Sequence, residues 1–192
     1  MIIIRHNTFE TNSSSTHAIG IPRKSNYKKQ KHIDFYWGEF GWEYNVYYDT
    51  LSKASYLYTM IKYFNGDYIK EHNKACEYIS KIRQYLDEED ITYCFEESHC
   101  SDYFDNGYID HGSYSAEIVE GILKSKESFL TYLFDDKAYV STGNDNEDGY
   151  YIPEIGREND FYDFDEDGDY DKEWNEKITQ IELEYDMYYK GN

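Results

Sequence analysis

Cysteine and histidine side chains are the residues of this chain most suited to holding a metal. Cys94, His99 and Cys100 lie close together, and His111 follows after a stretch rich in Ser, Asp and Gly. Thiolate and imidazole groups are ligands that zinc prefers, and a structural zinc site needs about four of them. We therefore name Cys94, His99, Cys100 and His111 as the candidate zinc ligands, although their spacing matches no standard zinc module. The alternative is that the protein holds no metal.

A second polar cluster lies near the start of the chain, where Ser13, Ser14 and Ser15 precede His17. With Arg5, this cluster has the composition of a phosphate or nucleotide site, which makes it the enzyme-class alternative. A nucleophilic serine also needs an activating base, an orienting group and an oxyanion site. Serine-rich loops more often cap turns through hydrogen bonds to the backbone. The chain has no Gly-x-Ser-x-Gly elbow, phosphate-binding glycine loop or His-Glu-x-x-His motif, so we expect no enzyme and no catalytic residues.

A run of aspartates imitates the start of a calcium-binding EF-hand loop. Asp163, Asp165, Asp167 and Gly168 match its opening positions. That loop needs a bidentate glutamate at its twelfth position, which is Trp174 here. The pattern therefore excludes a true EF-hand and leaves weak, unselective binding of divalent cations.

Residues 157–176 form an acidic, aromatic segment. From Glu158 to Glu176 there are ten acidic side chains, one basic side chain and five large aromatic ones. Duplex DNA carries roughly one negative charge per 1.7 Å of its axis, so such a segment imitates DNA and adds apolar contact. Acids promote association and specificity, and aromatic anchors supply affinity. The alternative is a solvated acidic loop. The expected partner-binding residues are Asp163, Phe164, Asp165, Glu166, Asp167, Asp169, Tyr170, Asp171 and Trp174.

The elements that must position these groups follow from the pattern of apolar residues. We expect strands over residues 1–5, 17–22, 33–37, 43–48, 91–97 and 137–142. We expect helices over residues 51–64, 69–86, 115–123 and 129–134, the third of them capped by Ser115. Residues 177–189 fit a strand or a helix equally well. This order indicates an α+β fold in a single domain, residues 1–192, with an antiparallel or mixed sheet and helices packed to one side.

The net charge and the composition restrict the class of partner that the protein can bind. The chain of 192 residues has a formal net charge of −20, with 24 Tyr and 10 Phe. Residues 1–33 carry a net charge of +5, which leaves −25 for the remainder. A field of this sign repels nucleic acid and attracts basic surfaces. We therefore expect no direct binding to nucleic acid, and a basic, nucleic-acid-binding protein as the partner.

Other features of the sequence indicate a cytoplasmic protein. The chain has no run of about 18 apolar residues, so we expect no transmembrane helix and no membrane partner. The opening residues MIIIR are too short for a signal peptide. Without an export signal, the odd number of three cysteines indicates reduced thiols.

Three patches resemble proteins of one origin. The opening Phe9–His17 (FETNSSSTH), with Arg5 and Asn7 before it, resembles the start of a group of uncharacterised proteins from phages and mobile elements of Gram-positive bacteria. Residues Tyr108–Ser113 and Thr142–Asn146 resemble further shared patches of that group. The resemblance implies an origin and no particular activity. Small acidic phage proteins include anti-CRISPR inhibitors, some of them DNA mimics and some of them metal-bearing binders.

Origin and charge together predict an inhibitory binding protein. It would dock on the basic nucleic-acid-binding surface of a host nuclease, foremost a type II CRISPR effector, and block the loading of guide or target DNA. The enzyme-class alternative at Ser13–His17 remains open, and a structural phage component is a third possibility.

Overall fold

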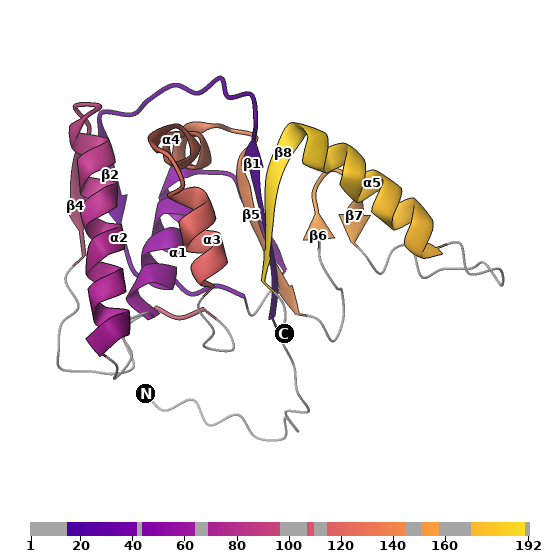
Figure 1. Cartoon of the computed structure of the whole chain (residues 1–192), viewed down its shortest axis with the longest axis horizontal. Coiled ribbons are helices and arrows are strands. Elements are labelled where there is room, and N and C mark those ends of the chain that lie inside the picture. The colour runs from indigo at the N-terminus through magenta and orange to yellow at the C-terminus, as the bar shows by residue number, and fades with distance from the viewer. Residues whose placement is uncertain are drawn as a thin grey trace.

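The computed structural model describes residues 15–41, 44–63, 69–96, 107–109, 115–144, 151–157 and 170–190. Figure 1 shows how its helices and strands are arranged. In chain order these are β1 (Ser15–Pro22), β2 (His32–Phe35), β3 (Asn45–Tyr47), α1 (Thr50–Tyr63), α2 (Ile69–Asp87), β4 (Thr92–Phe95), α3 (Ala116–Ile122), α4 (Lys126–Phe134), β5 (Tyr139–Asn144), β6 (Tyr151–Ile152), β7 (Gly156–Arg157), α5 (Tyr170–Glu184) and β8 (Tyr185–Lys190).

The centre of the fold is an antiparallel sheet with the strand order β3-β5-β1-β8. β1 lies inside the sheet, between β5 and β8, and all eight of its residues are buried. Neighbouring side chains of β1 point to opposite faces of the sheet. Ile19 and Ile21 accordingly belong to one hydrophobic core, and Ala18 belongs to another. The sheet is therefore covered on both faces.

Helices α1, α3 and α4 cover the first face of the sheet, and α2 lies farther out, beside the parallel pair of strands β2 and β4 (Figure 1). The first core fills this layer with side chains such as Tyr56, Leu57 and Phe129, which are fully buried. Ser115 and Ser125 cap α3 and α4, because each hydroxyl accepts a hydrogen bond from a backbone amide of the first turn.

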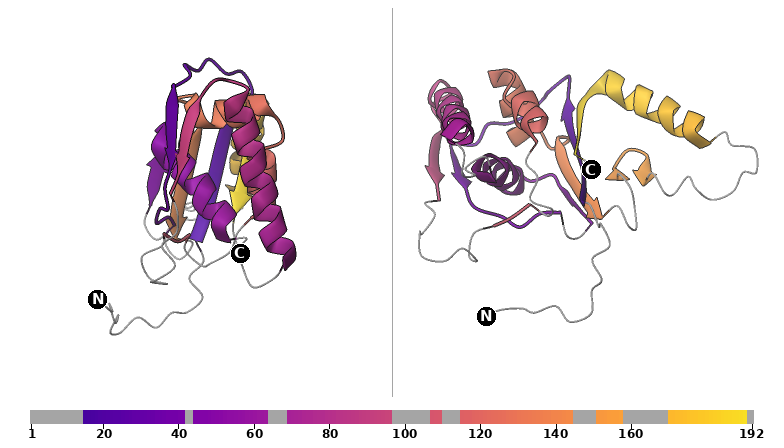
Figure 2. Two further views of the ribbon diagram at one scale, coloured as in Figure 1. Left: turned by 90° about the vertical axis from the view of Figure 1, so that its left-hand side faces the viewer. Right: turned by 60° about the horizontal axis from the view of Figure 1, so that its bottom comes forward.

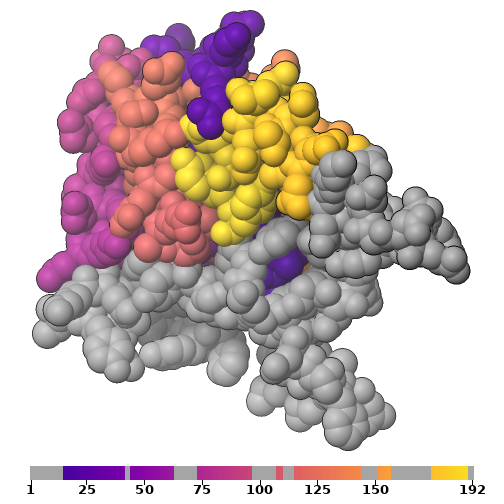
Figure 3. Space-filling model, turned by 45° about the vertical axis from the view of Figure 1, so that its right-hand side comes forward, coloured from indigo at the N-terminus to yellow at the C-terminus, as the bar shows by residue number. Residues whose placement is uncertain are grey.

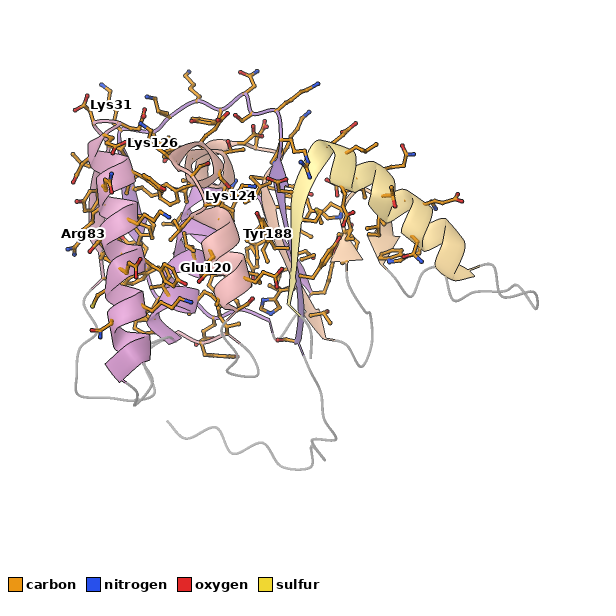
Figure 4. The ribbon with its side chains drawn as sticks, in the orientation of Figure 1. Lys31, Arg83, Glu120, Lys124, Lys126 and Tyr188 are labelled. Carbon is orange, nitrogen blue, oxygen red and sulfur yellow. The ribbon has the colours of Figure 1, made fainter. Side chains whose placement is uncertain are left out.

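The packing of α3 on the sheet depends on a glycine. Gly121 lies where a Cβ atom would collide with the ring of Tyr188 on β8. The Tyr188 side chain lies between the sheet and the helices, as Figure 4 shows. A residue without a side chain is therefore needed at position 121 for β8 to lie against α3.

The second face of the sheet carries the β6–β7 hairpin and α5. Figure 2 shows both on the side of the sheet opposite α1 to α4. The second core joins them to the sheet through Ala18, Tyr139, Ile152, Ile181 and Tyr185. This layer holds most of the described part of the acidic C-terminal region.

The predicted α+β fold class is confirmed, with an antiparallel central sheet and four helices on one side of it. The expected strand at 17–22 begins two residues earlier, since Ser15 and Thr16 pair with Asn144 and Gly143 of β5. Residues 177–189 divide between the end of α5 and β8. No helix within the described ranges is long and apolar enough to span a membrane.

Candidate functional site

The strongest chemical feature of the chain is the charge of residues 145–186, which we call the acidic module. It contains 17 acidic and three basic side chains, a net charge of −14 out of −20 for the whole chain. The structure describes β6, β7 and α5 within it. Figure 3 shows α5 and β8 together on the surface beside α3. Most of the charge of the protein therefore belongs to one continuous stretch of the sequence.

α5 packs against the sheet through one apolar face, and its described glutamate side chains are exposed to solvent. Trp174, Ile178 and Ile181 recur at helical spacing and pack against the second core. Glu176 and Glu182 are exposed. The helix is thus anchored by apolar contacts, and its carboxylates remain accessible to a partner.

Arg23 ties the end of α5 to the sheet. The last turn of α5 has no basic residue, and Glu182 and Glu184 lie where negative charge opposes the helix dipole. The Nε atom of Arg23 donates to the carbonyl oxygens of Glu182 and Tyr185 at 3.1 and 3.3 Å. Its guanidinium also pairs with Asp186 at 3.0 Å. A cation that follows β1 therefore supplies the charge that the helix end lacks.

The predicted partner-binding residues divide into three groups. Asp163, Phe164, Asp165, Glu166, Asp167 and Asp169 lie outside the described residues. Tyr170 and Asp171 form the start of α5. Trp174 is half-buried against the second core, so it supports the fold in addition to any contact with a partner. The sequence between β7 and α5 is therefore attached to the folded body at both ends.

The candidate zinc ligands are described at one position only. Cys94 lies exposed on β4, opposite Asp34 of β2, and has a free thiol. His99, Cys100 and His111 lie outside the described residues. Within the described ranges, no three His, Cys, Asp or Glu side chains lie close enough to hold a metal ion. The zinc site remains a prediction from the sequence.

The serine–histidine cluster is described from Ser15 onwards, and Ser13 and Ser14 lie outside the described residues. Ser15, Thr16 and His17 are part of β1, and their side chains are buried. The His17 Nδ1 atom and the Tyr56 hydroxyl oxygen are 2.7 Å apart and form a hydrogen bond inside the core. Burial raises the pKa of Tyr56 well above its usual value. The described part of this cluster therefore contributes to core packing.

A cavity of about 270 Å³ opens beside Arg23, between β8 and the start of α4. Lys124, Ser125 and Ser128 contribute to its wall. Arg23 and Lys124 both contact the carboxylate of Asp186, which also lines the cavity. The two cations are therefore already paired, and the other polar groups of the wall are hydroxyl groups and the Glu127 carboxylate.

Comparisons with known proteins add no assignment to this geometry. No protein-family model, curated protein or solved structure matches the chain.

Proposed function

We propose that this protein is an inhibitory binding protein, without enzymatic activity, encoded by a phage or mobile element. Its acidic module occupies a basic nucleic-acid-binding surface of a bacterial nuclease in the cytoplasm of the host cell. The partner is a type II CRISPR effector nuclease, and occupation of its groove blocks the loading of guide or target DNA.

The observation that supports this proposal most is the concentration of charge in the acidic module. Its net charge of −14 lies within 42 residues, which include the elements that cover the second face of the sheet. The segment between β7 and α5 is held by folded elements at both ends. Its acidic and aromatic residues imitate the charge of nucleic acid and add apolar contact. Such a segment is suited to recognition.

Most ion-paired cations of the helical side leave this charge uncompensated, because they pair with acids of that side; Lys124, which pairs with Asp186 of the module, is the exception. Lys29 and Lys126 both contact Glu89, at 2.5 and 2.8 Å. Lys74 pairs with Glu120 at 2.7 Å. Lys126 and Glu120 lie on the helical side of the molecule, away from α5 (Figure 4). Coulomb attraction weakens over about 10 Å at ordinary salt concentrations, so these cations contribute little at the acidic module.

The phosphate or nucleotide alternative receives less support from the described residues. A ligand at the Ser13–His17 cluster would have to reach side chains on β1, but Ser15, Thr16 and His17 are buried there. The binding proposal requires no such rearrangement, since the described acids of α5 are exposed.

A cleavage assay with a purified type II CRISPR effector nuclease tests the proposal. The protein is added before the guide, and three acids of the module are reversed: Asp163→Lys, Asp165→Lys and Asp167→Lys. We expect the half-inhibitory concentration to rise at least about tenfold, because each reversal turns attraction to the basic groove into repulsion.

The matched control reverses three exposed acids outside the module: Glu39→Lys, Glu77→Lys and Asp136→Lys. It changes the net charge by the same amount, and we expect inhibition within about threefold of the wild-type value. Equal loss in both variants would mean that only net charge matters. Full inhibition by the first variant would show that the acidic segment is a solvating loop.

A further inference from the structure

Glu154 lies at the turn of the β6–β7 hairpin. The amide of Ile155 donates to the carbonyl oxygen of Ile152 at 3.0 Å and closes the turn, in which Pro153 fixes one backbone angle. Ile152 is fully buried, and Ile155 packs against the second core. The side chain of Glu154 is exposed. A carboxylate is therefore held at the surface on a firmly packed support.

Tyrosines from other elements surround this carboxylate. The hydroxyl of Tyr139 donates to Glu154 Oε2 at 3.1 Å. Tyr185 is also close enough to interact with this carboxylate, and burial together with Glu154 raises the pKa of Tyr185 to about 12. The Tyr48 ring lies 6.1 Å from the Tyr139 ring, centre to centre, and Tyr48 is 43% exposed. Burial, Glu154 and Tyr151 all raise the pKa of Tyr48.

The carboxylate of Glu154 has hydrogen-bond acceptor positions left for a ligand. A carboxylate has about four acceptor positions, and the Tyr139 hydroxyl uses one of them. None of the ion pairs among the described residues involves Glu154. An exposed anion beside an exposed aromatic ring attracts a cation that has a flat, weakly hydrated surface.

We infer that Glu154, with Tyr48, Tyr139, Tyr151 and Tyr185 around it, is a docking site for an arginine side chain of the basic partner. A guanidinium group donates two parallel hydrogen bonds to a carboxylate and stacks on an aromatic ring, which a lysine ammonium does not do. The site lies within the acidic module, so the charge of the module guides a basic surface towards it. The arginine site itself is inferred from the geometry, and only the identity of the protein that supplies the arginine rests on the proposed function.

The test uses the full-length protein and two short peptides, one of five arginines and one of five lysines, in a titration followed by backbone amide NMR shifts. We expect the arginine peptide to bind several-fold more tightly and to shift the amides of Tyr48, Tyr151 and Glu154. Glu154→Gln should weaken its binding about tenfold, because a charge-assisted bidentate contact becomes a neutral one. Gln keeps an oxygen that accepts the Tyr139 hydrogen bond, so the fold should persist, which thermal unfolding checks.

Glu77→Gln is the matched control, since it removes the same charge from an exposed position on α2, outside the acidic module. We expect it to change the affinity for the arginine peptide by less than about twofold. The inference is overturned if the two peptides bind equally, or if the two variants lose the same affinity. The charge-reversal variant of the cleavage assay retains Glu154, so the two proposals fail independently.

Discussion

Ile181→Asp is expected to lower the free energy of unfolding by about 4 kcal/mol, because it removes buried apolar surface and places a carboxylate in the second core. Ile181 is 7% exposed and packs with Tyr139, Ile152 and Tyr185. It is one of the contacts that hold α5 on the sheet. The variant should therefore release α5 while the first core, on the other face, stays intact.

Leu183→Asp is the matched control for this variant. Leu183 is on the same helix, is 71% exposed, and gains the same charge on substitution. Its effect should stay within about 0.5 kcal/mol. Chemical denaturation gives the two stabilities, and hydrogen exchange shows where protection is lost. The account predicts loss along α5 and retained protection in α1. Equal stability of the two variants would contradict the packing of α5 through its Ile181 face.

A steep loss of stability above about pH 10 is the second large effect, since unperturbed tyrosine has a pKa near this value. Burial raises the pKa of five tyrosines, to about 12 for Tyr78 and Tyr185 and further for the other three. These residues are Tyr56, Tyr78, Tyr132, Tyr139 and Tyr185.

A group whose folded pKa is raised contributes stability that is complete below its unfolded pKa and is lost as the pH rises beyond it. Each deeply buried tyrosine therefore removes about 1.4 kcal/mol per pH unit above pH 10. Tyr56, Tyr132 and Tyr139 together remove about 8 kcal/mol over two pH units, and Tyr78 and Tyr185 add less because solvent partly screens them. That approaches the whole stability of a typical domain. The exposed, ion-paired lysines change stability in the same direction but by little, because solvent screens them.

Lys53 makes the stability of the fold change with pH in the opposite direction, at lower pH. Its side chain is fully buried, and its Nζ donates to the carbonyl oxygens of Asp135 and Ala138 at 2.7 and 3.0 Å. Burial lowers the pKa of Lys53 to about 8. The unfolded state then binds more protons than the folded state between about pH 8 and 10.5, and stability rises in this window by up to about 3 kcal/mol.

Denaturation midpoints measured across this pH range, with tyrosinate absorbance, test both slopes. The wild type should gain stability from pH 8 and then lose it abruptly as tyrosinate absorbance and unfolding appear together. Lys53→Met should abolish the gain and keep the loss. Tyrosinate absorbance that develops fully near pH 10 in the folded protein would contradict the burial of these rings.

Local signals in the sequence predicted most of the fold. Apolar residues at helical spacing predicted α1 and α2, and Ser115 predicted the start of α3, where its hydroxyl accepts a hydrogen bond from the Ile118 amide at 3.3 Å. These signals succeed because the interactions lie within one or two turns of the chain. The fold class followed from the order of the elements.

Non-local contacts account for what the sequence did not predict. Ile178 and Ile181 follow a helical period, but the next residues become β8 because they pair with β1, from the other end of the chain. The strands β6 and β7 have two residues each, too few to show a period. Glu154 carries no motif, and its tyrosine neighbours come from different parts of the chain. Trp174 is a residue type that often anchors a protein interface, but whether its side chain faces a partner or the core depends on how α5 packs.

Whether the acidic module occupies a nucleic-acid groove is decided by binding of the guide-free type II effector nuclease to the immobilised protein, at low and high salt and with guide RNA added. We expect binding that weakens at least about tenfold between 50 and 200 mM salt and that guide RNA displaces. Absence of binding, or binding that neither salt nor guide RNA affects, would contradict the claim that the acidic module occupies a nucleic-acid groove.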